Sequence, residues 1–527
     1  MTRAFFTKQN LKNACFGLSM LSFSSSLFGF FVDGSGHYGV RGFTLVNPGA
    51  SPKKGIPQAI EQTFRLEAEV RSGDHASFFG EFRLFTDPRN AYLGDTSQPS
   101  TCNGNENCSS KTQSLTDPGY SWYTPKVTEF YLRYAFDYCI LQAGRYPKDW
   151  GMGMFLDSGK RPFSISSSFA DGINCSVNLQ KFQDLTFNVG YDKLTETGFT
   201  KPTPTRSDIG ASKRADDIDQ IYVSVELDDR KTRPGSSFNK QIGIYAAKIS
   251  SGEVASGGLN TELSIADLYL GFYFPQFSFR SEFLMYLGSS SDPNSFALGG
   301  ADKNASKETA KNSMNSIAFA GSMEWLMSGS PRTPQEAYLG SMGSRHISFF
   351  DYAFAPGDSQ GYYNDTAKDD TALSSSKRSE NARAMALNSN FKPALILFNG
   401  RSNSDNLRVD GIFDPTRIMN AQVFGLGYRF ENKDFGNLES KVITAFLNQS
   451  IPDDAKAHYS TQTEKVVGYY GKNLGYELDL KYWKTFSGGI DVGLSAGALV
   501  PGLAWQISDD QPALNSYLLQ AHLIYNF

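Results

Sequence analysis

Apolar and polar residues alternate with a period of two along much of the chain. From Phe64 to Arg71, apolar side chains stand at every second position, with arginine and glutamate between them. The same alternation recurs in 128–138, 277–288 and 317–325. Successive side chains of a β-strand point to opposite faces, so this period predicts strands with one apolar and one polar face. Each stretch has about 9 to 13 residues, the length that a tilted strand needs to cross a bilayer.

The connections between these stretches alternate between short and long. Tight turns are expected near Asp74, Tyr138, Lys181, Pro275 and Ser487. Short periplasmic turns and long outer loops are typical of outer-membrane barrels, and with 353–416 as one outer loop we expect about 18 strands and periplasmic termini. The long polar segments, rich in Gly, Ser, Asn and Asp, are 88–125, 148–170, 193–216, 289–313, 353–416 and 451–473.

These patterns predict an all-β fold, a transmembrane antiparallel up-and-down β-barrel in the outer membrane of a Gram-negative cell. The composition agrees with a barrel fold: aromatic residues make up 14% of the chain and charged residues 20%. The mean hydropathy of −0.36 is too low for a helical membrane protein. A barrel combines aromatic content with polarity because half of each strand faces lipid and half faces water. A sandwich or propeller would show shorter, evenly spaced strands.

The first 29 residues have the layout of a secretory leader. Arg3, Lys8 and Lys12 precede a short apolar stretch at 14–23, and small residues follow. This order predicts a signal peptide at 1–29, cleaved to leave a single barrel domain at 30–527. An uncleaved anchor helix is the alternative.

The C-terminal strand suggests how the barrel is assembled. From Tyr517 to Phe527 apolar side chains alternate with polar ones, and the strand closes on an aromatic residue. Such a strand resembles the signal that the barrel-assembly machinery of bacteria reads. We therefore expect that machinery and outer-membrane lipid as partners.

The cysteines indicate an oxidising compartment. Cys102 and Cys108 enclose a short polar loop without further metal ligands close by, so we expect a disulfide between them. Cys139 and Cys175 fall in two successive predicted strands, where either a second bridge or two buried thiols fits.

No motif for catalysis, a metal or a cofactor has the context that its chemistry requires. The GxGxxG pattern at 34–39 opens no helix, and the five histidines are scattered without metal-ligand spacing. A formal net charge of −4 gives no basic signature for nucleic acid. We expect neither an enzyme nor a nucleic-acid-binding protein.

Charged residues on the polar face of the strands are the remaining candidates for function. Rings of charged side chains determine which solutes pass a pore, although such charges also pair with one another in a plugged barrel. About 18 strands enclose a lumen too wide for wall side chains to fill, which favours a channel. The candidates for the solute path are Arg65, Arg71, Arg83, Arg133, Arg145, Arg280, Arg429, Glu477, Asp479 and Lys481.

The C-terminal third resembles the alginate-export family of outer-membrane porins. Gly475, Glu477 and Asp479 match a Gly-x-Glu-x-Asp strand of that family, and Pro501 and Gly502 match a Pro-Gly strand end. Val500 departs from the phenylalanine usual there. The resemblance also extends to 346–358 and to the Ala-Gly-Arg sequence at 143–145.

The resemblance implies an 18-stranded barrel that passes an anionic polysaccharide, with Arg145, Glu477, Asp479 and Lys481 at the lumen. The mixed charge of the inward face departs from the electropositive constriction of the family. We therefore expect passive conduction of a polysaccharide or another hydrophilic solute. A surface structural or adhesion barrel with a plugged lumen is the alternative, and inward folding of 353–416 would gate the pore.

Overall fold

The computed structural model describes most of the barrel wall and part of the connections. The expected signal peptide at 1–29 and the expected disulfide between Cys102 and Cys108 lie outside the described residues. No helix among the described residues is long and apolar enough to cross a membrane. The described residues are 30–47, 58–84, 126–164, 168–179, 185–194, 218–230, 236–251, 261–290, 312–329, 343–357, 381–382, 385, 387–388, 390–398, 417–449, 471–505 and 513–527.

Eighteen long antiparallel strands form the wall. One further strand, β14 (Asn381–Ala382), pairs parallel to β12 beside the main order, and a 3-10 turn, η7 (Leu503–Trp505), follows β18. The long strands are β1 (Phe30–Val46), β2 (Gln58–Ser72), β3 (Ala76–Leu84), β4 (Lys126–Ala135), β5 (Ile140–Pro147), β6 (Phe169–Leu179), β7 (Leu185–Leu194), β8 (Ile218–Asp228), β9 (Asn239–Ser251), β10 (Thr261–Tyr273), β11 (Phe277–Ser290), β12 (Asn312–Ser328), β13 (Arg345–Ala355), β15 (Ala421–Asn432), β16 (Gly436–Leu447), β17 (Asn473–Phe486), β18 (Ile490–Pro501) and β19 (Ser516–Asn526).

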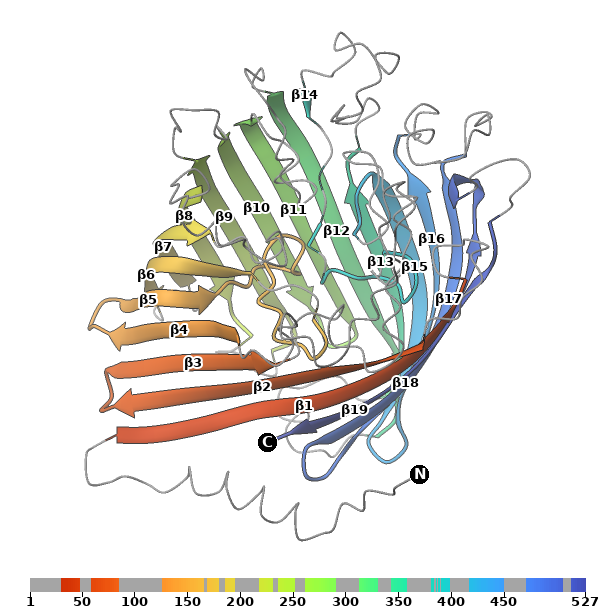
Figure 1. Cartoon of the computed structure of the whole chain (residues 1–527), viewed down its shortest axis with the longest axis horizontal. Helices are drawn as coiled ribbons and strands as arrows, with labels where there is room; N and C mark the ends of the chain where they lie inside the picture. The colour runs from red at the N-terminus through yellow and green to blue at the C-terminus, as the bar shows by residue number, and fades with distance from the viewer. Residues whose placement is uncertain are drawn as a thin grey trace, which may run out of the picture.

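The sheet closes on itself because the last strand pairs with the first. Each long strand is antiparallel to its neighbour in the chain, with β13 paired to β15, and β19 pairs with β1 from His37↔Asn526 to Val46↔Tyr517 (Figure 1). Gly36 and Phe527 also exchange two backbone hydrogen bonds, at 2.9 and 3.0 Å. Closure leaves no free sheet edge, which is the condition for a sheet to span a membrane. The predicted closed 18-stranded barrel is confirmed.

The two faces of the wall differ as the alternation predicts. In β4, Phe130 and Leu132 are 54% and 44% exposed, whereas Tyr131 between them is only 7% exposed. In β9, exposed Ile244 alternates with buried Tyr245. Large apolar side chains therefore cover the outside of the barrel, where only lipid can solvate them favourably. The protein is an integral membrane barrel, in agreement with the predicted outer-membrane location.

Aromatic side chains gather at the end of the barrel that carries the short turns. Phe274 packs near Phe277 at 6.3 Å between ring centroids, and Phe277 near Trp325 at 6.4 Å. Tyr525 and Phe527 lie 5.9 Å apart at the same end. Aromatic girdles mark the membrane–water interfaces of such barrels, and short turns mark the periplasmic side, so this end lies at the periplasmic interface.

The outward position of Leu132 gives a test of the facing of the wall. Replacement by arginine should lower the free energy of unfolding by about 2–4 kcal/mol if the position lies near the bilayer midplane. The measurement is chemical unfolding of the chain in lipid vesicles. Ser35→Arg is the control, because Ser35 is exposed and lies opposite Glu67 on the inward face of β1 and β2. A larger loss for Ser35→Arg than for Leu132→Arg would show that the faces are reversed.

Candidate functional site: two inward segments in the lumen

Residues 148–164, part of the segment 148–170 that was predicted as an outer loop, lie inside the barrel instead. The first of them, Lys148, is buried and forms an ion pair with Asp192 on β7. Its ammonium also donates to Gln220 at 3.2 Å and stands over the Tyr222 ring, 3.7 Å from the centroid. Burial lowers the pKa of the Lys148 ammonium, and the Asp192 carboxylate opposes this effect. The ion pair compensates both charges for their loss of water.

The first half of this segment packs on the wall formed by β9 to β11. The Trp150 ring lies 5.5 Å from that of Tyr245, and Met154 is fully buried. The backbone N–H of Met152 donates to the carboxylate of Glu282. A wall carboxylate thus binds a backbone amide that the lumen would otherwise leave without a partner.

The second half of the segment is held by arginines of β2 and β3. Arg65 donates to the carbonyl oxygen of Lys160 at 2.8 Å. Arg83 donates to the carbonyl oxygens of Gly159 and Ser158, both at 3.3 Å. Two predicted path residues therefore bind the backbone of the inward segment.

A second inward segment, described at residues 385, 387–388 and 390–398, lies within the long connection 353–416 and is held in the same way. Glu477 accepts backbone N–H groups of residues 395, 396 and 397 at 2.9, 2.6 and 2.8 Å. Asp479 accepts the first of these N–H groups as well, at 3.0 Å. Lys441 on β16 donates to the carbonyl oxygen of Pro393 at 2.9 Å. Both predicted acidic residues of β17 therefore bind the segment.

The two inward segments meet inside the barrel. The backbone N–H of Asn388 donates to the carbonyl oxygen of Met154 at 2.7 Å. The side-chain amide of Asn388 donates to the backbone carbonyl oxygen of Phe155 at 3.2 Å. Asn390 donates to Asp157 at 3.3 Å. In Figure 1 the orange segment that follows β5 and the teal segment that precedes β15 both run within the ring of strands. Together the two segments narrow the lumen.

Arg429 joins β12, β15 and β16 through carboxylates on the inward face of these strands. It donates to Glu439 at 2.9 Å and to Glu324 at 3.2 Å, and Lys481 lies 3.6 Å from the same Glu439. This network extends from β12 to β17 and leaves its charges largely paired within the wall.

Three further predicted residues lie toward the periplasmic end of the lumen. Arg71 pairs with Glu69 at 2.8 Å and Asp33 at 3.2 Å and is half-exposed. Arg133 is exposed on the inward face of β4, and Arg280 is half-buried on that of β11. These side chains face the lumen and make no hydrogen bond or ion pair with the described residues of either inward segment.

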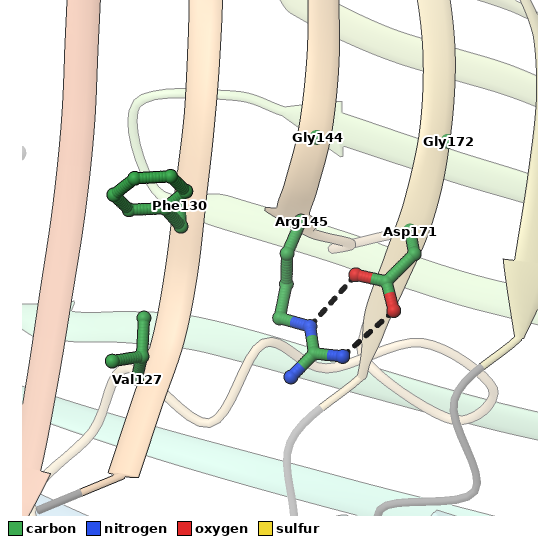
Figure 2. Close-up of a pocket in the computed structure, with 6 residues that line it drawn as sticks. All are labelled: Val127, Phe130, Gly144, Arg145, Asp171 and Gly172. Atoms are coloured by element: carbon green, nitrogen blue, oxygen red, sulfur yellow. Dashed lines mark hydrogen bonds and ion pairs between the residues drawn. The ribbon is translucent and has the colours of Figure 1, made fainter.

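Arg145 is the one predicted lumen residue on the wrong face. It lies directly opposite Phe130 of β4 and Asp171 of β6, so its side chain points outward with Phe130. Its guanidinium makes a bidentate pair with Asp171, with both N···O distances 2.7 Å (Figure 2). Both its polarity and the family resemblance assigned Arg145 to the lumen, but near a strand end a charge can also face the lipid headgroups.

Several residues of this site were missed from the sequence, among them Lys148, Asp192 and Lys441. A signal for the first inward segment was present in Trp-Gly-Met-Gly-Met at 150–154, which is apolar for an outer loop. Cys139 and Cys175 are free thiols in the structure. Among the described residues, no group of three His, Cys, Asp or Glu side chains is arranged to hold a metal ion.

No family model matches the chain, and no curated protein matches it in sequence. Three solved structures from Pseudomonas aeruginosa are similar to it: the outer membrane protein OprD, OccK2 (OpdF) in complex with glucuronate, and OccK8 (OprE). Their TM-scores are 0.44, 0.44 and 0.45 and their identities 10%, 10% and 9%. Each match covers 94% of this chain, and 94%, 98% and 98% of those chains. The expected alginate-export family is wrong: the similar structures are OprD and OccK proteins.

The buried pair of Lys148 and Asp192 makes a prediction about stability. Lys148→Met leaves the Asp192 carboxylate buried without its counter-ion, which should lower the free energy of unfolding by about 3–5 kcal/mol. The double variant Lys148→Met/Asp192→Asn should regain most of that loss. Chemical unfolding of the wild type, both single variants and the double variant measures the coupling. Additive losses would show that the two charges do not stabilise each other.

Proposed function

We propose that the protein is a passive outer-membrane channel for small hydrophilic solutes. The observation that carries this proposal is the pair of inward segments, 148–164 and the described residues of 385–398, held by charged wall residues inside a closed barrel. A barrel of about 18 strands encloses more space than wall side chains can fill. Segments bound to opposite walls narrow this space without requiring a separate domain.

The size of the solute follows from this narrowing. Two stretches of backbone that touch at Asn388 and Met154 leave less width than the bare barrel. Such a lumen suits a small solute that passes one molecule at a time. The solute would be polar, because charged side chains such as Arg71 and Arg133 face the lumen on the periplasmic side.

A structural barrel with a closed lumen is the second candidate, and one observation favours it. Apolar side chains of both inward segments, including Met154, Met385, Leu387 and Ile396, belong to a single buried cluster with the wall. A continuous apolar cluster excludes water from that part of the lumen. The two candidates differ in whether a hydrated path remains beside it.

Conductance of the refolded mature chain in a planar bilayer distinguishes the two candidates. A channel should give discrete single-channel steps, with ion preference read from the reversal potential in a salt gradient. Folding is checked independently by heat-modifiable migration in gels. Folded protein that stays silent would contradict the channel and support the closed structural barrel.

Glu477 gives a test of the inward segment as the constriction. Glu477→Ala removes the acceptor of three backbone N–H groups, so residues 390–398 should detach from the wall and the single-channel step should become larger. Limited proteolysis within the segment should become faster as well. Glu69→Gln is the matched control, because Glu69 is an inward carboxylate that pairs with Arg71. Unchanged conductance in folded Glu477→Ala would place the solute path elsewhere.

A further inference from the structure

A row of charged side chains runs across the outside of the barrel wall. In the strand register, Arg145 lies opposite Asp171, Asp171 opposite Lys193, and Lys193 opposite Asp219. Residues directly opposite each other in a sheet share a face, and this row continues from outward-facing Phe130. The signs of the four charges alternate along the row. With strands about 4.8 Å apart, the row spans roughly 15 Å.

The row continues onto the next two strands. Lys248 of β9 and Glu262 of β10 form an ion pair at 2.7 Å, with their side chains 62% and 57% exposed. Buried Ile249 and Leu263 follow them directly in the chain, so the charged pair points away from the lumen. The outward charges therefore extend from β5 to β10.

The depth of the row places it at the outer edge of the membrane. Arg145 and Lys193 lie close to the ends of β5 and β7, and Asp171 and Asp219 close to the starts of β6 and β8. These are the strand ends opposite the aromatic girdle and the chain terminus Phe527. Charges on a lipid-facing barrel wall cost about 2–4 kcal/mol at the midplane and little near the interface. The row is thus at the level of the outer-leaflet headgroups.

Arg145 retains a hydrogen-bond donor for a ligand. Its Nε and Nη2 atoms bind the two oxygens of Asp171, and no described residue accepts from Nη1. Figure 2 shows this third nitrogen on the side away from Asp171, toward Val127. A guanidinium with an outward free N–H edge is suited to bind an anionic oxygen.

A notch on the outer wall lies beside this donor. Its volume is about 520 Å³, and it is lined by Val127, Phe130, Gly144, Arg145, Asp171 and Gly172 (Figure 2). Gly144 and Gly172 occupy inward register positions, opposite Tyr131 and Asp192, so they line the notch with backbone alone. The notch therefore combines an apolar surface, suited to an acyl chain, with a charged rim.

We propose that this outward row binds the phosphorylated glycolipid of the outer leaflet. Its phosphates would accept from Arg145 and Lys193, and its sugar hydroxyls would donate to Asp171 and Asp219. A ligand that brings both anionic oxygens and several hydroxyl donors matches a row of alternating sign better than a phospholipid with one phosphate. The inference rests on the membrane location and is independent of the proposed conduction.

Binding to the full mature chain in detergent micelles tests the proposal. The probes are bisphosphorylated lipid A, its dephosphorylated form and phosphatidylglycerol, each titrated and followed by native mass spectrometry. The wild type should bind the bisphosphorylated form most tightly. Arg145→Gln/Lys193→Gln should weaken that binding by about tenfold or more, since two charge-assisted contacts are lost. Arg133→Gln/Lys481→Gln, which removes two inward charges, should leave it unchanged.

Three results would overturn the proposal. One is equal binding of bisphosphorylated lipid A to the wild type and to folded Arg145→Gln/Lys193→Gln. Another is that the wild type binds the dephosphorylated form as tightly as the bisphosphorylated form, a comparison that needs no variant to fold. The third is that the wild type binds phosphatidylglycerol as tightly as bisphosphorylated lipid A, which would make the row a general phosphate site. Conductance of Arg145→Gln/Lys193→Gln should match that of the wild type, which separates this inference from the proposed channel.

Discussion

The backbone of the inward segments must find hydrogen-bond partners inside the lumen, and the lumen of this barrel is built around that requirement. A chain segment away from regular structure carries N–H and C=O groups that cost free energy when they are buried without partners. Here the wall supplies both kinds of partner. Carboxylates of Glu282 and Glu477 accept from N–H groups, whereas Arg65, Arg83 and Lys441 donate to carbonyl oxygens.

This division of roles explains why charges of both signs are needed on the inward face. A wall with one sign of charge could satisfy only one half of the backbone groups. It would also bury like charges close together, which raises their mutual repulsion in a medium of low dielectric constant. The ion pairs between Arg65 and Glu81 and between Lys148 and Asp192 offset the burial of charge beside the segments.

The fold could be predicted from the sequence because its determinants are local and repeated. A period of two over strand after strand, as at Phe130, Tyr131 and Leu132, specifies the facing of each strand. The turns and long connections then specify the order. The position of 148–164 depends instead on contacts with Glu282 and Arg65, which lie far away in the chain, and no local pattern encodes such contacts. The roles of Glu477 and Asp479 could not be predicted from the sequence for the same reason: alternation indicated that they face inward, but not what they bind.

Arg145 shows a second limit, in the reading of polarity as direction. The rule that charged residues face the lumen holds across the hydrocarbon core, where exposure of charge to lipid is costly, and it fails at the membrane interface. A shift of one residue along the strand decides whether a side chain faces the lumen or the lipid, because neighbouring residues point to opposite faces. Replacement of an anchoring wall charge would therefore change the shape of the lumen together with its field. Its effect on conduction could not be assigned to electrostatics alone, whereas replacement of Arg145 leaves the lumen charges untouched.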